Sequence, residues 1–149
     1  MTTTEKPDLD RPDRRPTLHD PAAHAAAEEV ATRFAAELQA GLDTADADAY
    51  DRSFAADVLW GSPYGATVTE FDELIAIHRR LMGAVTAPPS RFDVVAVRAP
   101  APGVAVAQIR RQALDDRGFS ENALYVLVER AGRWWLAAAQ NTPVGTPGA

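Results

Sequence analysis

The chain has 149 residues, a length that suits one domain, and it contains no cysteine. The absence of cysteine excludes disulfides, zinc sites with cysteine ligands and thiolate catalysis. The formal net charge of -6 argues against a nucleic-acid-binding protein, which normally has a basic face. No apolar run is long enough to span a membrane, and no apolar signal segment is visible near the N-terminus, so we expect a cytoplasmic protein with no membrane or nucleic-acid partner.

The first segment of the chain is rich in proline and charged residues and shows no hydrophobic period. Such a composition cannot bury enough apolar area to order the backbone. We therefore expect a disordered arm over residues 1–20, a single folded domain over 21–144 and a frayed tail over 145–149.

Helical spacing of apolar residues predicts two helices in the first part of the domain. Asp20 and Pro21 are a suitable N-cap and first-turn proline for the first helix, and Gly41 is its expected stop. A second, shorter helix is predicted over residues 45–55 and a strand over 58–60.

A third helix is predicted to start at Thr69, where Thr69 and Asp72 fit the spacing of a capping box. Its apolar stripe is interrupted once, by His78, and continues to Leu81 and Met82. A histidine on such a stripe is either a core residue with its hydrogen bonds satisfied or a group that faces a cavity, where it would suit acid–base chemistry. Both interpretations stay open from the sequence.

After two adjacent prolines, the hydrophobic period changes from helical spacing to alternation. Alternation predicts four strands joined by turns, over residues 91–99, 104–114, 121–130 and 133–142. Helices gathered before a meander of strands predict an α+β fold with the helices on one face of an antiparallel sheet. Long twisted strands would curl around the helices and leave a conical space between the layers.

Polar residues on these strands have more than one interpretation. Gln108, Arg110 and Gln112 alternate on one side of their strand, and Arg111 points the opposite way. A polar file of this kind favours a solvated or dimer-facing side of the sheet over a cavity wall. Glu121 could be a catalytic acid or base, but we expect a solvated carboxylate at the end of a strand.

Trp134 and Trp135 are adjacent on the last predicted strand and must therefore point to opposite faces of the sheet. One indole can serve the interior, whereas the other must be exposed or lie in an interface, so we expect a homodimer built on the outer sheet face. Gln140 and Asn141 end the same strand, and only one of these amides can point inward.

Three segments of the chain carry a resemblance to a known superfamily. They are Asp46-Ala47-Asp48-Ala49-Tyr50 with Phe54–Val58, then Trp60-Gly61-Ser62-Pro63-Tyr64-Gly65, and Tyr125–Val128 through Gly132–Trp135 to Asn141-Thr142-Pro143-Val144. Over residues 22–144 the chain resembles nuclear-transport-factor-2-like proteins, which include ketosteroid isomerases and SnoaL-type polyketide cyclases. The last four of these residues resemble more specifically the SgcJ/EcaC-type branch, found among enediyne antibiotic biosynthesis proteins. The resemblance implies a cone-shaped, cystatin-like α+β roll with three N-terminal helices packed on a strongly curved antiparallel sheet.

The resemblance also implies a ligand pocket inside the cone. We expect His78 to be its candidate catalytic residue and its ligand-binding residues to be Trp60, Ser62, Tyr64, Met82, Tyr125, Gln140 and Asn141. Ketosteroid isomerases carry a carboxylate base just before the proline that follows the first strand, and Ser62 occupies that position here. A serine cannot abstract a carbon-bound proton near neutral pH without an activating base. No group of three His, Asp or Glu ligands is visible in the sequence, so we expect neither a metal nor another cofactor.

Three functions remain open from the sequence. The first is binding and cofactor-free conversion, by cyclisation, isomerisation or proton transfer, of a hydrophobic polyketide-type intermediate in enediyne antibiotic biosynthesis. The second is a non-catalytic carrier or an accessory partner of a polyketide synthase. The third is a dimerisation module with a filled cone. An enzyme needs a titratable group inside the cavity, whereas a carrier needs only shape and an apolar lining.

Overall fold

The computed structural model describes residues 14–84 and 87–145, so most of the predicted N-terminal arm and of the predicted tail lies outside the described residues. The elements follow in the order η1 (Pro21–Ala23), α1 (His24–Asp43), α2 (Ala47–Tyr50), β1 (Phe54–Gly61), β2 (Thr67–Val68), α3 (Phe71–Ala84), β3 (Ser90–Ala101), β4 (Val104–Ala113), β5 (Glu121–Arg130) and β6 (Arg133–Pro143).

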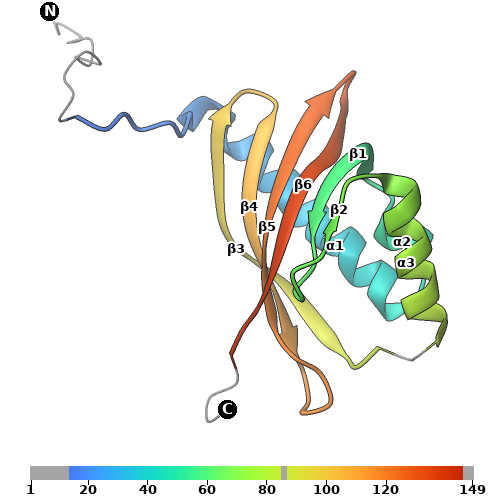
Figure 1. The fold of residues 1–149 in the computed structure, drawn as a ribbon. Coiled ribbons are helices and arrows are strands. Elements are labelled where there is room, and N and C mark those ends of the chain that lie inside the picture. The colour runs from blue at the N-terminus through green and yellow to red at the C-terminus, as the bar shows by residue number, and fades with distance from the viewer. Residues whose placement is uncertain (1–13, 85–86, 146–149) are drawn as a thin grey trace, which may run out of the picture.

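The strands form one six-stranded sheet in the order β2-β1-β6-β5-β4-β3. Neighbouring strands pair antiparallel, except that β1 and β6 are parallel. α1 crosses one face of the curled sheet and packs on β3 and β4, whereas α3 packs against β1 and α2 (Figure 1). The predicted α+β architecture, with helices on one face of a strongly curved sheet, is confirmed.

The end of the predicted arm is attached to β3. The backbone N–H of Asp20 donates to the carbonyl of Ala99 at 2.7 Å, and the N–H of Ala99 donates to His19 Nδ1 at 3.0 Å. The Asp20 side chain also accepts from the N–H of Ala22 at 3.0 Å, which is the predicted N-cap. The chain is therefore fixed to the sheet immediately before the first helical turn.

The second predicted helix is wrong in length. α2 ends at Tyr50, and β1 already begins at Phe54. The N–H of Phe54 donates to the carbonyl of Asp51 at 3.0 Å and closes a turn that leads the chain into the sheet. Tyr50 and Phe54 are both buried. Residues four positions apart would also lie on one face of a continuous helix, so helical spacing alone could not reveal the turn between Tyr50 and Phe54.

Gly41 lies inside α1 instead of at the predicted stop of the helix. A Cβ atom at this position would lie 2.6 Å from both the N and the Cα atom of Tyr50. Gly41 is therefore the position where the backbone of α2 packs directly against α1.

Replacement of Gly41 by alanine should lower the free energy of unfolding by about 2 kcal/mol, because the added methyl group meets backbone that cannot give way. Gly83 is the matched control, since it is also helical and a Cβ atom there meets nothing within 4 Å. Gly83→Ala should raise stability by about 0.5–1 kcal/mol through helix propensity. Urea denaturation measures both changes, and equal effects would contradict the close approach at Gly41.

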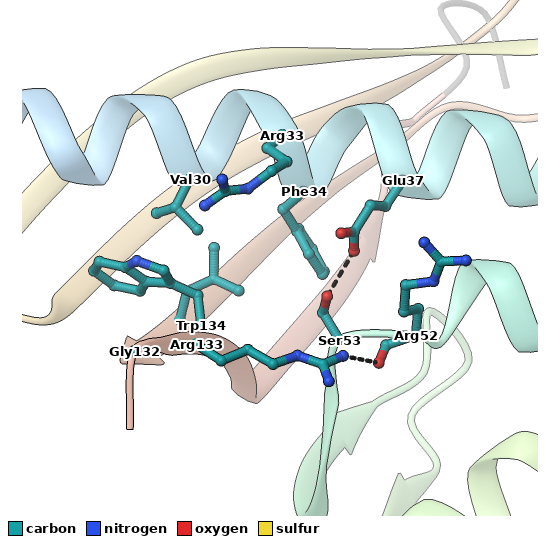
Figure 2. A pocket seen from close by; sticks show the side chains of 10 residues that line it. Val30, Arg33, Phe34, Glu37, Arg52, Ser53, Gly132, Arg133 and Trp134 are labelled. Carbon is teal, nitrogen blue, oxygen red and sulfur yellow. Dashed lines mark hydrogen bonds between the residues drawn. The ribbon is translucent and has the colours of Figure 1, made fainter. Parts of the chain in front are cut away.

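Two hydrogen bonds fasten neighbouring segments around the middle of α1 (Figure 2). The Ser53 hydroxyl donates to Glu37 Oε2 at 2.6 Å, which ties the start of β1 to α1. The Arg133 guanidinium donates to the carbonyl of Arg52 at 3.3 Å, which ties the β5–β6 hairpin to the same segment. These contacts border a hollow between α1 and the hairpin.

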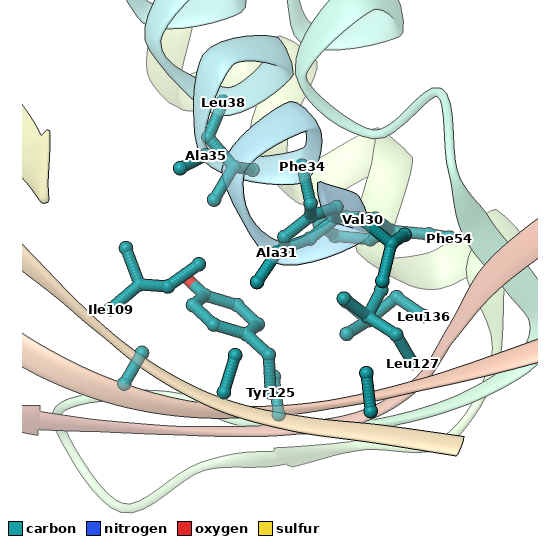
Figure 3. Packing of buried hydrophobic residues seen from close by; sticks show 14 of the residues in the cluster. Val30, Ala31, Phe34, Ala35, Leu38, Phe54, Ile109, Tyr125, Leu127 and Leu136 are labelled. Atoms are coloured by element: carbon teal, nitrogen blue, oxygen red, sulfur yellow. The ribbon is translucent and has the colours of Figure 1, made fainter. Parts of the chain in front are cut away.

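The hydrophobic core lies between α1 and the concave face of the sheet (Figure 3). The Phe34 ring meets Tyr125 edge-on at 5.1 Å between centroids and lies 6.2 Å from Phe54. Further core side chains come from α1 and from three strands: Val30, Ala31, Leu38, Ile109, Leu127 and Leu136. The apolar stripe predicted for the first helix thus faces the sheet.

Candidate functional site

A histidine–aspartate pair lies between α2 and α3. His78 Nδ1 is 2.7 Å from Asp51 Oδ1 and 2.8 Å from Oδ2. The Asp51 side chain is 0% exposed and the His78 side chain 12%. A carboxylate that accepts from one ring nitrogen fixes the tautomer and orientation of an imidazole. His78 therefore has the partner that a general acid–base group requires.

Asp51 follows the last residue of α2 as its C-cap, so its position depends on the turn into β1. Burial raises the pKa of the Asp51 carboxyl, and the hydrogen bond with His78 offsets part of that rise. Within the described part of the chain, the carboxyl is thus held out of water and the His78 imidazole is its side-chain hydrogen-bond partner.

Three aromatic rings surround the His78 imidazole. Its ring centroid lies 5.4 Å from that of Trp60, 5.5 Å from Tyr50 and 6.3 Å from Phe54, each in an edge-on arrangement. Trp60 and Phe54 stack on each other at 5.3 Å. We call Tyr50, Phe54 and Trp60 the aromatic cage. It keeps the imidazole in apolar surroundings, where electrostatic interactions are stronger than in water.

Four polar side chains cross the concave face of the sheet at one end: Ser90 on β3, Arg111 on β4, Glu121 on β5 and Asn141 on β6. Arg111 Nε donates to Ser90 Oγ at 3.1 Å, and Arg111 Nη1 lies 3.9 Å from Glu121 Oε1. Asn141 Nδ2 donates to the carbonyl of Gly61 at 2.8 Å. We call this row the polar belt, and its members Ser90, Glu121 and Asn141 are buried.

The expectation of a solvated Glu121 is wrong, since only 9% of the residue is exposed. Burial raises the pKa of its carboxyl, and the positive charge of Arg111 lowers it in part. Arg111 lies opposite it in the β4–β5 register. The sequence had placed Arg111 on the side away from Gln108, and the structure agrees, because Gln108 is exposed.

Tyr50 lies between the histidine pair and the polar belt. Its ring contacts both His78 at 5.5 Å and Phe92 at 6.3 Å. Burial raises the pKa of Tyr50, with smaller effects from the charges of Arg111, Glu121 and Asp51. Burial likewise raises the pKa of Tyr125 well above its usual value. Both phenols are therefore neutral near pH 7 and can donate a hydrogen bond.

Four of the residues predicted for the ligand site lie on the inner side of the sheet or pack against the core, and one of them, Trp60, contacts His78. Trp60, Tyr125 and Asn141 are buried, and Met82 packs against the core. Asn141 is thus the inward amide of the terminal pair, whereas Gln140 is exposed. Leu81 was predicted to belong to the buried apolar stripe of the third helix. This prediction is wrong, because Leu81 is exposed.

Ser62 and Tyr64 do not join this site. Ser62 Oγ accepts from the backbone N–H of Tyr64 at 3.2 Å and of Ala66 at 3.0 Å, and so closes the turn between β1 and β2. The Tyr64 side chain is 81% exposed and lies near the Phe119 ring. A serine before a proline at a strand end is typical of a turn, and this use explains Ser62 without a ligand.

Sequence reasoning missed Asp51 altogether and took Tyr50 only as an apolar helix residue. The available signal was the order Tyr50-Asp51-Arg52-Ser53-Phe54, in which a carboxylate stands between two large apolar side chains. Ser90 gave no signal, because its role depends on the position of Arg111 across the sheet.

Glu121→Gln should flatten the pH dependence of stability. A folded-state pKa above the unfolded value means that the folded chain holds the proton more tightly, so the contribution of Glu121 is largest at acidic pH and is lost as pH rises through the raised pKa. Urea unfolding from pH 4 to pH 7 should show a smaller decline in the variant than in the natural chain. Glu129→Gln, at an exposed position on the same strand, should leave the decline unchanged.

Three hollows on the surface of the described residues lie away from the histidine pair. The first is lined by Arg33 and Trp134, the second by Phe71 and Trp135, and the third by Leu59 and Leu124, each with further residues. Neither His78 nor Tyr125 lines any of the three. The cage rings contact the His78 imidazole directly, and 12% of the His78 side chain is exposed. The open pocket around Trp60, His78, Met82 and Tyr125 stays a prediction.

Within residues 14–84 and 87–145, no three His, Asp or Glu side chains are grouped so that they could hold a metal ion. Among the same residues, no helix has both the length and the apolar composition that crossing a membrane requires.

No protein-family model and no curated protein matches the sequence. Solved structures do match in fold. A domain of unknown function with a cystatin-like fold from Nostoc punctiforme superposes with a TM-score of 0.70 at 17% identity, covering 81% of this chain and 79% of that one. An NTF-2 like protein of unknown function from Shewanella oneidensis gives 0.68 at 12% identity, covering 77% and 98%. An NTF2-like protein from Cytophaga hutchinsonii gives 0.63 at 18%, covering 78% and 98%. The chain therefore has the cystatin-like, NTF2-like fold that its sequence resembles.

Proposed function

We propose that this chain binds a hydrophobic, extended polyketide-type intermediate between α3 and the concave face of the sheet and converts it without a cofactor. The observation that carries the proposal is the buried contact of His78 Nδ1 with Asp51 at 2.7 Å, inside an aromatic cage. The sequence suggested His78 alone, and the carboxylate partner supplies what an acid–base role requires.

The chemistry that suits these groups is proton transfer next to a carbonyl. His78, held through Nδ1 by Asp51, uses Nε2 to take a proton from the carbon beside the carbonyl, and the electron pair moves to the carbonyl oxygen. The Arg111 guanidinium and the neutral Tyr50 hydroxyl are the donors near this site for the enolate oxygen. Return of the proton to another carbon gives isomerisation. Attack of the enolate carbon on a second carbonyl gives cyclisation, with the proton passing to the new alkoxide.

The pathway follows from the resemblance of Asn141-Thr142-Pro143-Val144 to the SgcJ/EcaC-type branch. We assign the substrate on this basis to enediyne antibiotic biosynthesis in the cytoplasm. The cone fold itself is shared by proteins of unknown function, so the substrate class rests on the sequence segment and on the apolar, aromatic character of the cage.

A non-catalytic carrier, or an accessory partner of a polyketide synthase, is the second candidate. The direct contact of all three cage rings with His78 favours it, because the imidazole then serves packing. In that case the chain shields a reactive intermediate and its affinity depends on apolar shape alone.

The test exposes the purified protein to an extract of an enediyne-producing strain and identifies the co-purifying compound by mass spectrometry. Incubation of the isolated compound with the natural chain and with His78→Gln then separates the two candidates. An enzyme converts the compound, and His78→Gln binds it within about tenfold of the natural affinity but slows conversion at least about 100-fold. Binding without conversion establishes the carrier, and the absence of any bound polyketide refutes both.

We also propose that the chain is a homodimer through the outer face of the sheet. The two adjacent tryptophans do face apart: Trp134 packs toward the core, and Trp135 lines a different hollow under the Arg133 guanidinium. Leu59 and Leu124 are large apolar residues that stay exposed on the outer face, where they line a shallow hollow.

Sedimentation at micromolar concentration should give the mass of a dimer, and Leu124→Glu should shift it toward a monomer because it places a charge in the apolar contact. Leu81→Glu is the control, since Leu81 is at least as exposed as Leu124 but lies on α3. A monomeric natural chain, or dissociation by both substitutions, would refute this interface.

A further inference from the structure

A hollow that does not include the histidine pair opens between α1, the start of β1 and the β5–β6 hairpin (Figure 2). Its volume is about 290 Å³. Val30, Phe34 and Trp134 give it an apolar wall, with the Trp134 indole at one end. This volume is at the lower limit of small-molecule pockets, so it suits a ligand of one or two rings.

The residues around this hollow carry a net positive charge, whereas the chain as a whole is negatively charged. Three guanidinium groups line it, those of Arg33, Arg52 and Arg133, against a single carboxylate, that of Glu37. The full chain has a formal net charge of -6. Among the described residues, the ion pairs involve other arginines or histidines, so none of these three is neutralised by a carboxylate within contact distance. A small anion would supply the missing negative charge.

The side chains are arranged so that Glu37 does not fill this role. Glu37 turns toward Ser53 and accepts its hydroxyl at 2.6 Å, whereas Arg33 extends to the side of Val30 and Trp134 (Figure 2). Arg133 is held by its bond to the Arg52 carbonyl at 3.3 Å and by the Trp135 ring, whose centroid lies 3.9 Å below the guanidinium carbon. A guanidinium group that is already positioned, as that of Arg133 is, loses less side-chain freedom when it binds an anion.

We propose that this hollow binds a small aromatic carboxylate, with the carboxylate facing Arg33 and the ring against Trp134. Guanidinium groups match the planar geometry of a carboxylate and form charge-assisted hydrogen bonds with it. A phosphate is less suitable, because Glu37 would repel a second negative charge. The site is separate from the aromatic cage, and the inference does not rest on the proposed conversion at His78.

The probe is 2-naphthoate, titrated into the full chain by calorimetry, with 2-naphthamide as its uncharged counterpart. We expect saturable binding of the acid and binding of the amide at least about tenfold weaker, because the amide lacks the charge that strengthens the hydrogen bond with the guanidinium; tenfold corresponds to about 1.4 kcal/mol. Arg33→Gln should weaken binding of the acid at least about tenfold for the same reason. Arg80→Gln, also on an exposed helix surface but outside the hollow, should change it by less than about twofold.

Nuclear magnetic resonance of the indole N–H groups locates the ligand. The chain has three tryptophans, and the signal of Trp134 is the one lost in Trp134→Phe. Addition of 2-naphthoate should shift the Trp134 signal and leave that of Trp60 in place. Any one of four results would overturn the proposal. They are the absence of saturable binding up to about 5 mM, equal binding of the acid and the amide, no effect of Arg33→Gln on binding of the acid, and a shift of the Trp60 signal alone.

Discussion

Replacement of Trp60 by alanine should lower the free energy of unfolding by about 3–4 kcal/mol, the loss typical of a buried aromatic side chain that leaves a cavity. Only 6% of Trp60 is exposed, and its ring stacks on Phe54 at 5.3 Å and meets His78 at 5.4 Å. Urea denaturation monitored by circular dichroism measures the change without relying on the tryptophan signal that the substitution removes.

Tyr64→Ala is the matched control, because Tyr64 lies just after the same strand and is 81% exposed. Its removal should change stability by less than about 0.5 kcal/mol. A loss below about 1 kcal/mol for Trp60→Ala would contradict the packing of the cage.

The size of this effect decides how ligand binding at the cage should be tested. A Trp60→Ala chain that is partly unfolded loses affinity for any ligand, whether or not the indole touches it. Trp60→Phe keeps an aromatic ring against Phe54 and His78 and removes only part of the contact area. Affinity should therefore be compared between the natural chain and Trp60→Phe under conditions where both are fully folded.

Periodicity predicted which faces of the long elements are buried. The stripe of the first helix does meet the sheet through Phe34, and His78 does point inward from α3. Alternation on β4 placed Arg111 and Gln108 on opposite sides, as observed. These predictions succeeded because burial along one element follows directly from its own repeat.

The chemistry of the site depends on contacts between elements, which no local repeat encodes. Asp51 becomes a partner of His78 only because the turn after α2 brings it under α3. Glu121 is buried because the β4–β5 register places it opposite Arg111, whereas a strand end seen by itself predicts a solvated carboxylate. Ser62 resembled a ligand-facing residue, but its oxygen is used by two backbone N–H groups of the turn.

Removal of the Asp51 carboxylate should weaken both the fold and the chemistry. Asp51→Ala leaves His78 Nδ1 without its partner. The His78 side chain is only 12% exposed, and a largely buried polar group that loses its partner costs about 1–3 kcal/mol, so we expect stability to fall by about 2 kcal/mol. Asp48→Ala is the control, because Asp48 also belongs to α2 but forms an exposed pair with Arg79, which contributes at most about 1 kcal/mol.

A second measurement distinguishes a positioning role from packing alone. An ionised carboxylate can only accept a hydrogen bond, so neutral His78 should carry its proton on Nδ1, beside Asp51, and leave Nε2 as the base. Nitrogen-15 resonance of the ring should show this tautomer in the natural chain and a smaller share of it in Asp51→Ala. Conversion of the substrate should fall at least about 100-fold along with it. If Asp51→Ala destabilised the chain but left the tautomer unchanged, Asp51 would serve the packing of α2 against α3, and the carrier would be the better account of the protein.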